Sequence, residues 1–344
     1  MFPITTTCLD ILIYIIQHNA TLLILGGESM KTSLKASIIA IVISLSTSAF
    51  AATPLVDETW VNKNLTNNNV IFLDVRGKLA GKSKADFLRG HIPGAIWTNY
   101  LKDGWRTKDK NGTPGQLPET TKLEKLIGSL GIGNSNHIVI VPQGGKALDM
   151  GTATRIYWTF KVLGHENVSI LNGGMAAYAK IDPKTKKPIN ALEKGDVKKS
   201  PKVFKAKLQT NMIIAKSDVV EALKEGTPLV DNRPNNQYVG VNQHPRAKRL
   251  GTIPGAKNFP ENWMTANGGG KFRPTNQLKK LFKLAGVNSS GDQITFCNSG
   301  HWASLGWFVS HELVGNKKSK MYDGSMIEWS SDMTLPIEQK IKIN

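Results

Sequence analysis

Residues 70–76 read Val-Ile-Phe-Leu-Asp-Val-Arg, an apolar run that ends in an acid and a base. A similar run, Pro-Leu-Val-Asp-Asn-Arg, occupies residues 228–233. Short apolar runs of this kind are typical of strands that are buried on both faces of a parallel sheet. Because the run recurs with the same Asp-x-Arg ending, the chain is expected to contain two copies of one unit.

Three further pairs of motifs keep the same order in the two halves of the chain. They are the Ile-Pro-Gly-Ala turn at 92–95 and 253–256, the apolar run at 138–141 and 294–296, and the Asn/Asp-Gly-x-Met turn at 172–175 and 323–326. The offset between the copies stays between 151 and 161 residues. Chance rarely produces four unlike motifs in order at a near-constant offset, so we predict a duplicated domain.

Helical stretches alternate with the strands, over Thr120–Leu130, Ala153–Leu163 and Asn276–Leu284. This alternation predicts an α/β fold with two tandem domains, each a mostly parallel sheet flanked by helices. The length of 344 residues is sufficient for two cores. We expect an N-terminal domain over residues 55–180 and a C-terminal domain over residues 214–335.

The connector between the domains, residues 181–213, lies in a lysine-rich region with ten lysines from Lys180 to Lys207. We expect it to run over the surface as a linker with some extended structure. A strip that binds a polyanion is the alternative. The net charge of +18 favours anionic partners, but no nucleic-acid-binding motif accompanies it. We therefore expect small anions and no nucleic acid.

Residues 30–51 have the pattern of a secretory signal peptide. A basic start at 30–35 precedes an apolar run at 36–45 and the cleavage sequence Ala-Phe-Ala at 49–51. The apolar run is too short for a permanent membrane anchor. We expect cleavage before Ala52 and a periplasmic protein with no stable membrane anchor.

Residues 1–29 precede this signal, and we interpret them as an upstream extension that is not translated. Gly-Gly-Glu-Ser at 26–29 is what a purine-rich ribosome-binding site encodes when it is read in frame, so translation is expected to start at Met30. The alternative is a genuine hydrophobic extension centred on Ile11–Ile16.

The mature chain then holds one thiol, because Cys8 lies in the segment that is removed. Cys297 follows the strand 294–296 and precedes the loop 298–302 and a helix expected over about 303–313. A short loop between a buried strand and a helix N-terminus points several backbone N–H groups at one spot, where they stabilise a thiolate or a bound anion. We therefore predict an exported enzyme whose catalytic nucleophile is Cys297.

The repeat, the Asp-x-Arg strand ends, the Ile-Pro-Gly-Ala turns and the Cys-x-Ser-Gly loop together resemble the two-domain rhodaneses, the thiosulfate and 3-mercaptopyruvate sulfurtransferases. The resemblance covers about residues 55–335. It implies a double displacement without a cofactor, in which Cys297 takes sulfur from an anionic donor as a persulfide and passes it to cyanide or a thiol. It also implies a non-catalytic N-terminal copy, and Pro142, which has neither thiol nor N–H, stands there in the position of Cys297.

The substrate-binding residues that we expect are the rest of the cysteine loop and two arginines: Asn298, Ser299, Gly300, His301, Trp302, Arg233 and Arg249. The loop lacks the paired basic residues that the resemblance associates with thiosulfate-preferring enzymes, and its Ser-Gly pair is closer to the mercaptopyruvate type. Gln237 stands where the family often places a second substrate-binding arginine. Arg246, Lys248 or Arg249 is expected to supply that charge, or else to form a solvated basic turn.

Two loop residues have two interpretations each. His301 is either a proton donor or thiolate partner, or a loop residue whose ring faces solvent. Trp302 either closes over the site or packs beneath the loop.

Other functions fit the sequence less well. A cysteine-loop phosphatase requires an arginine shortly after the cysteine to clamp phosphate, and residues 298–304 contain none. No Cys or His cluster has metal-ligand spacing, so no metal is expected. A periplasmic persulfide carrier or redox-binding protein, which delivers sulfur to a thiol protein without turning over small donors, remains the alternative to an enzyme.

Overall fold

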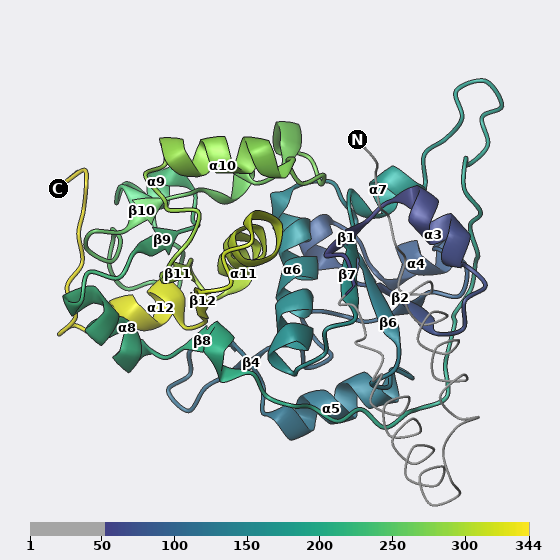
Figure 1. Cartoon of the computed structure of the whole chain (residues 1–344), viewed down its shortest axis with the longest axis horizontal. Helices are drawn as coiled ribbons and strands as arrows, with labels where there is room; N and C mark the ends of the chain where they lie inside the picture. The colour runs from purple at the N-terminus through teal and green to yellow at the C-terminus, as the bar shows by residue number, and fades with distance from the viewer. Residues whose placement is uncertain (1–51, 344) are drawn as a thin grey trace, which may run out of the picture. The chain divides into compact units, whose positions relative to one another are not determined.

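The computed structural model describes residues 52–343 (Figure 1). The predicted upstream extension and signal peptide lie outside these residues. No helix among residues 52–343 is long and apolar enough to cross a membrane.

The first copy contains a five-stranded parallel sheet with the order β1-β7-β6-β2-β3. Its strands are β1 (Leu55–Val56), β2 (Val70–Asp74), β3 (Ile96–Trp97), β6 (His137–Val141) and β7 (Val168–Leu171), and a small antiparallel hairpin joins β4 (Thr107–Lys108) to β5 (Pro114–Gln116). The helices are α3 (Glu58–Asn64), α4 (Lys84–Arg89), α5 (Thr120–Ser129), α6 (Ala147–Val162) and α7 (Gly174–Tyr178), with a 3₁₀ turn η1 (Lys78–Ala80).

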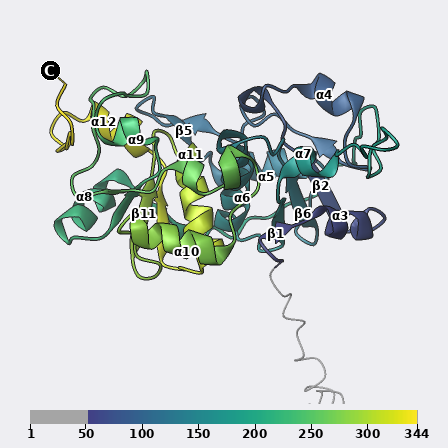
Figure 2. The same cartoon turned by 90° about the horizontal axis from the view of Figure 1, so that it is seen from above.

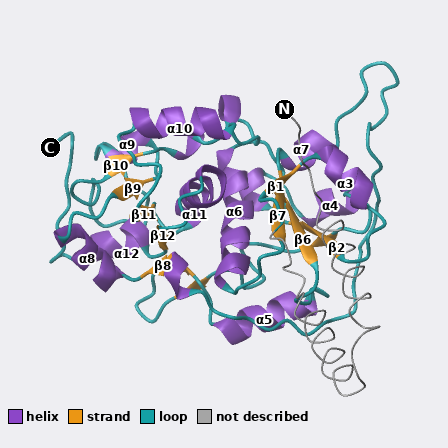
Figure 3. Cartoon of the chain, in the orientation of Figure 1, coloured by secondary structure: helices purple, strands orange, loops and turns teal. Residues whose placement is uncertain are grey.

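The second copy repeats this plan with the order β10-β9-β11-β12-β8, again parallel throughout. Its strands are β8 (Ile213–Ile214), β9 (Leu229–Asp231), β10 (Lys257–Asn258), β11 (Gln293–Phe296) and β12 (Ser319–Tyr322). The helices are α8 (Lys216–Lys224), α9 (Asn235–Tyr238), α10 (Thr275–Leu284), α11 (His301–Trp307) and α12 (Ser325–Ser331), with 3₁₀ turns η2 (Thr210–Met212), η3 (Glu261–Trp263) and η4 (Ala266–Gly268) and a π-helical turn η5 (Phe308–Val314). Helices flank both sheets (Figure 3), which confirms the predicted α/β fold with two tandem domains.

Helices α6 and α11 lie side by side between the two sheets (Figure 1 and Figure 2) and pack against each other. Helix α6 is buried on all sides, and its buried residues include polar and charged ones such as Asp149 and Arg155. Tyr157 meets Phe308 edge-to-face at 4.9 Å between ring centroids, and the Thr154 and Ser304 hydroxyl oxygens are 3.0 Å apart. One apolar core thus includes side chains of both domains, and Cys297 belongs to it.

Helix α6 begins six residues before the predicted start, at Ala147. The Asp149 carboxylate accepts hydrogen bonds from the Gly145 and Lys146 amides, each at 2.9 Å, and so caps the helix. The periodicity of apolar residues alone does not reveal this cap, because the cap depends on the side chain of Asp149.

The lysine-rich connector lies along the N-terminal domain. The Lys202 amide donates to the Gly128 carbonyl at 2.9 Å, the Lys207 amide donates to the Leu163 carbonyl at 2.9 Å, and Phe204 is buried. This close approach requires glycine at 128, since a Cβ there would lie 2.4 Å from the Lys202 carbonyl oxygen. The connector is therefore an extended segment that is packed onto the domain.

Candidate active site

Cys297 lies directly after β11, and its residue is 1% exposed. Two backbone hydrogen bonds attach its loop to the start of α12. The Met326 amide donates to the Cys297 carbonyl at 3.0 Å, and the Ile327 amide donates to the Asn298 carbonyl at 3.0 Å. The strand end and the helix start together fix the backbone on both sides of the thiol.

The amides of the cysteine loop fall into two groups. Those of Cys297 and Gly300 donate to the Ser325 hydroxyl oxygen, at 3.0 Å and 3.3 Å. The amides of Asn298, Ser299, His301 and Trp302 donate to no acceptor within residues 52–343. Unpaired N–H groups in one turn form a concavity that can bind an anion or stabilise a thiolate.

Gly300 permits this turn. Its φ is 75°, a left-handed conformation that glycine takes without strain. A Cβ at this position would lie 2.1 Å from Arg155 Nη1 and 2.2 Å from Asp323 Oδ1. The loop therefore folds directly against that ion pair.

The ion pair of Arg155 and Asp323 connects the two domains beside the loop. Arg155 is fully buried, and it donates to both carboxylate oxygens of Asp323 and to the Gly115 carbonyl at 3.0 Å. The Leu117 amide completes the set with a 2.7 Å bond to Asp323 Oδ2. Burial raises the cost of separating these charges, so the pair holds the hairpin β4–β5 and the catalytic domain in register.

Ser299 receives its basic partner from the N-terminal domain. Arg106 Nη2 donates to the Ser299 carbonyl at 2.5 Å and lies 3.0 Å from its hydroxyl oxygen. The same guanidinium group lies over the Tyr100 ring, 5.5 Å from its centroid. The cysteine loop contains no lysine or arginine, and Arg106 of the N-terminal domain supplies a permanent positive charge beside it.

Asn298 is paired with Gln237. The Asn298 amide nitrogen Nδ2 donates to Gln237 Oε1 at 2.9 Å. Gln237, which stands where the resemblance places a second arginine, therefore makes a neutral contact with the residue next to the cysteine.

His301 agrees with neither interpretation from the sequence. Its ring is buried, Nε2 lies 2.7 Å from the Leu148 carbonyl oxygen, and Nδ1 lies 3.1 Å from the Tyr100 hydroxyl. A carbonyl can only accept, so Nε2 carries the proton and Nδ1 accepts from Tyr100. Burial, with the nearby charges of Arg106 and Arg155, lowers the pKa of His301 to about 3. The ring stays neutral and both nitrogens are engaged between the domains, so it neither faces solvent nor offers a free proton to the thiol.

Trp302 is half-buried and packs against the shared core, as in the packing interpretation. Its indole N–H has no acceptor among the described residues.

The two expected arginines make structural contacts. Arg233 is 1% exposed, forms a 2.6 Å ion pair with Asp231 and donates to the Gly251 carbonyl at 2.8 Å. Arg76 makes the equivalent contacts with Asp74 and Gly90 in the first copy, so this arginine secures a strand end in both domains.

Arg249 is also committed to the backbone. It donates to the carbonyls of residues at and after the end of α12: Trp329, Ser330, Asp332 and Leu335. Both arginines thus have carboxylate or carbonyl partners in this structure, and their binding of substrate stays a prediction.

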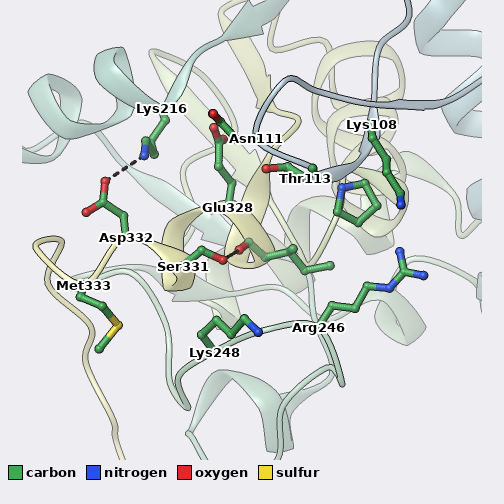
Figure 4. Close-up of a pocket in the computed structure, with 13 residues that line it drawn as sticks. Lys108, Asn111, Thr113, Lys216, Arg246, Lys248, Glu328, Ser331, Asp332 and Met333 are labelled. Atoms are coloured by element: carbon green, nitrogen blue, oxygen red, sulfur yellow. Dashed lines mark hydrogen bonds and ion pairs between the residues drawn. The ribbon is translucent and has the colours of Figure 1, made fainter.

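A polar cavity of about 790 Å³ lies between the β4–β5 hairpin and the residues of and around α12 (Figure 4), and no residue of the cysteine loop lines it. Ile327, whose amide binds the Asn298 carbonyl, forms part of its wall. Four cations line it: Lys108, Lys216, Arg246 and Lys248. Lys216 is paired with Asp332 at 2.8 Å, whereas the other three have no carboxylate partner among residues 52–343. Two of the three residues expected to supply a positive charge, Arg246 and Lys248, thus lie at this cavity.

The loop at Pro142 in the first copy forms the same backbone hydrogen bond with α7 as the cysteine loop forms with α12, but it has no thiol. The Met175 amide donates to the Pro142 carbonyl at 2.9 Å, as the Met326 amide does to Cys297. The amides of Gly145 and Lys146, which correspond to Gly300 and His301, are occupied by the Asp149 carboxylate. This loop therefore lacks the thiol, and the Asp149 carboxylate already occupies two of its amides.

Sequence reasoning missed Tyr100, Arg106, Arg155 and Asp323. Asp323 was noted only as part of a repeated turn, and nothing in the local sequence of the other three distinguishes them from surface or core residues. Their place at the loop results from the packing of one domain on the other. Within the described range, no group of three or more His, Cys, Asp or Glu residues could hold a metal ion.

Comparison with known proteins agrees with this geometry. Residues 57–181 and 215–332 each match the family model described as the rhodanese-like domain. A relative from Saccharopolyspora erythraea named as a thiosulfate sulfurtransferase is 32% identical over 295 residues, which cover 83% of this chain and 95% of the relative. The 3-mercaptopyruvate sulfurtransferase of Escherichia coli is 27% identical over 294 residues, covering 84% and 99%.

Solved structures show the same architecture. The crystal structure of SseA, a 3-mercaptopyruvate sulfurtransferase from Escherichia coli, superposes with a TM-score of 0.67 at 25% identity, covering 80% of this chain and 99% of that one. Tum1 from Saccharomyces cerevisiae has the same fold, with a TM-score of 0.67 at 21% identity over 83% and 98% of the two chains. The chain belongs to the rhodanese-like family, and its two domains make it a member of the tandem-domain rhodanese sulfurtransferases.

Proposed function

We propose that the protein moves sulfane sulfur from a small anionic donor to a thiophilic acceptor, with Cys297 as the sulfur carrier. The observation that carries this proposal is a set of four amides without an acceptor among the described residues, at Asn298, Ser299, His301 and Trp302, in the loop that follows Cys297. These dipoles stabilise negative charge first on the thiolate and then on the terminal sulfur of a persulfide.

With thiosulfate, the Cys297 thiolate attacks the sulfane sulfur, the sulfur–sulfur bond of the donor breaks, and sulfite leaves with the electron pair. With 3-mercaptopyruvate, the carbon–sulfur bond breaks and its electron pair forms the enolate of pyruvate, which then takes a proton. In both cases a persulfide is left on Cys297. Cyanide or a thiolate attacks the outer sulfur, and the returning electron pair regenerates the thiolate, so no external oxidant or reductant is required.

Two features support an anionic donor. Arg106 places a positive charge at Ser299 of the loop. Arg246 and Lys248 line the cavity that Ile327 also lines, and the Ile327 amide binds the Asn298 carbonyl. Charged donors of this kind attract and orient thiosulfate or the carboxylate of 3-mercaptopyruvate. Relatives named for both donors are known, so the preferred donor is decided by the measurement below.

The place of action is proposed from residues 30–51 alone. Their basic start, apolar run and Ala-Phe-Ala sequence predict export to the periplasm and cleavage before Ala52. A periplasmic thiol protein is the corresponding acceptor. Edman sequencing of the protein recovered from a periplasmic extract tests this, and a mature chain that retains Cys8 would exclude it.

The enzymatic proposal is tested with protein from Ala52 onward, incubated separately with thiosulfate and 3-mercaptopyruvate. Intact mass is measured before and after addition of cyanide, together with thiocyanate release, and Cys297→Ser is the control. We expect a gain of one sulfur atom that cyanide removes and that the variant lacks. A wild-type chain that gains no sulfur from either donor would contradict turnover of small donors and would favour a carrier loaded by a partner.

A further inference from the structure

Ser325 has a backbone conformation that serine rarely adopts. Its φ is 52°, and the residue is fully buried at the start of α12. Within residues 52–343, the other non-glycine residues with positive φ are Lys186 and Asn267, and both are exposed. A left-handed conformation at a buried side chain with a Cβ is strained, and such strain persists where surrounding contacts compensate for it.

The first domain shows what the fold itself requires at this position. Gly174 is its counterpart in the repeat, and its φ is 54°. Glycine takes this conformation without strain. The turn that precedes the helix therefore needs the left-handed backbone in both copies, whereas only the catalytic copy carries a side chain there.

The side chain of Ser325 supplies one oxygen with three hydrogen bonds. The hydroxyl donates to the Tyr322 carbonyl at 2.8 Å and accepts from the Cys297 amide at 3.0 Å and the Gly300 amide at 3.3 Å. Because its own hydrogen points to Tyr322, its lone pairs face the two amides. The oxygen thus connects the two ends of the four-residue turn that starts with the cysteine.

The N-terminal loop cannot use such an oxygen. Pro142 stands in the position of Cys297 and has no N–H. A Cβ at Gly174 would also lie 2.3 Å from the Pro142 carbonyl oxygen and 2.8 Å from the Gly144 amide nitrogen. The strained serine and the cysteine therefore occur together in one copy and are both missing from the other.

We propose that Ser325 is a positioning residue that holds the cysteine loop in the conformation in which its free amides stabilise the Cys297 thiolate and persulfide. The proposal rests on the proposed sulfur transfer for its persulfide part. The Ser325 hydroxyl accepts from the Cys297 and Gly300 amides, whereas the amides of Asn298, Ser299, His301 and Trp302 have no acceptor among the described residues and remain available to the sulfur. Without the hydroxyl, two buried amides lose their acceptor, and the turn can rotate to satisfy them.

Two variants separate the hydroxyl from the backbone strain. Ser325→Ala keeps the Cβ and the strain but lacks the oxygen, and Ser325→Gly lacks the oxygen and relieves the strain. Ser310→Ala is the matched control, since Ser310 is a buried serine whose hydroxyl donates to Gln293 Oε1 at 2.6 Å and forms no hydrogen bond with residues 297–302.

Three quantities are measured on each variant: the rate of sulfur loading from the better donor, the pH profile of Cys297 alkylation by iodoacetamide, and the midpoint of thermal unfolding. We expect both Ser325 variants to load about tenfold more slowly and to be alkylated with a midpoint about one pH unit higher, the size that one lost hydrogen bond to a charged group produces. Ser325→Gly should unfold at a higher temperature than Ser325→Ala. Ser310→Ala should keep the wild-type loading rate and pH profile.

Wild-type loading and a wild-type alkylation profile in Ser325→Gly, with defects in Ser325→Ala alone, would overturn the proposal, because the defect would then follow strain and not the hydroxyl. A wild-type chain that is alkylated but never loaded with sulfur would contradict sulfur transfer. The alkylation profiles of the variants would still decide whether Ser325 controls the thiolate.

Discussion

Arg106 Nη2 donates to the Ser299 carbonyl oxygen across the interface between the two domains, at 2.5 Å. The first residue belongs to a domain that has no catalytic cysteine, and the second lies two residues after the cysteine of the other domain. The N-terminal copy therefore contributes a positive charge to the cysteine loop of the other domain.

Replacing Arg106 tests this contribution. Arg106→Met is expected to lower kcat/KM for the donor at least tenfold, mainly through KM, because a charge-assisted hydrogen bond and an attraction for the anion are both lost. Arg106→Lys keeps the positive charge but lacks the planar set of guanidinium donors, and it should recover part of the lost kcat/KM. Lys110→Met, which removes an exposed cation of the same hairpin, should change neither constant. Equal steady-state constants in Arg106→Met and wild type would contradict the role of Arg106.

Gln237→Arg tests whether the neutral residue next to the cysteine loop determines which donor is preferred. A guanidinium group at this position would replace the neutral bond to Asn298 Nδ2 with a positive charge next to the cysteine. We expect the ratio of kcat/KM for thiosulfate to that for 3-mercaptopyruvate to rise about tenfold, since the dianion gains more from an added charge. Asn236→Arg adds the same charge at the exposed neighbouring residue and should leave the ratio unchanged. The two donors are compared in parallel steady-state assays, and an unaltered ratio in Gln237→Arg would count against this explanation.

His301 makes stability depend on pH. Its pKa is about 3 in the folded protein, against about 6.5 in an unfolded chain. Below pH 6.5 the unfolded state therefore binds more protons, and the stabilisation that is fully present above this pH is lost as the pH falls toward 3. At pH 5 the loss amounts to about 2 kcal/mol.

His301→Gln isolates this contribution, because glutamine does not titrate. Urea unfolding at pH 7 and pH 5 should show a loss of stability that is about 2 kcal/mol smaller in the variant than in wild type. His137, whose pKa burial lowers to about 4, contributes equally to both proteins and cancels in the comparison. The same acid-induced loss in both proteins would show that His301 does not titrate in the way its burial requires.

The ion pair of Arg155 and Asp323 is expected to be the largest polar contribution to the interface. Asp323→Asn leaves the fully buried guanidinium without its counter-charge and should lower the free energy of unfolding by about 3–5 kcal/mol. Asp332→Asn breaks the solvent-accessible ion pair with Lys216 and should lower the free energy of unfolding far less. Urea unfolding of both variants gives the comparison, and a similar small loss in the two would mean that the buried pair does not hold the domains together.

Much of the fold followed from short-range patterns. The buried strand runs at 70–74 and 229–231 are apolar because helices cover both faces of each sheet, and the recurring Asp-x-Arg endings form the same ion pair in both copies. The start of α6 was misplaced because its cap depends on one aspartate, Asp149, that returns to the amides before it.

The candidate site was only partly accessible from the sequence. Cys297 and its loop could be located, because a strand, a glycine-containing turn and a helix are consecutive in the chain and local in their geometry. Arg233 was assigned to substrate from its position in the motif, whereas its guanidinium group secures the strand end. The residues next to Arg233 in the sequence do not reveal whether its guanidinium group will bind a substrate anion or the carboxylate of Asp231.

The sequence by itself determined the duplicated α/β plan, the loss of the thiol at Pro142 and the position of Cys297, since each depends on residues that are adjacent in the chain. Only the tertiary structure decided which charges reach the loop and what His301 does. Arg106 and Ser299 are 193 residues apart, and Tyr100 and His301 are 201 apart. Such pairs form when α6 and α11 pack together and bury a common core. This packing brings Arg106 to Ser299, and the burial that accompanies it keeps the His301 ring neutral.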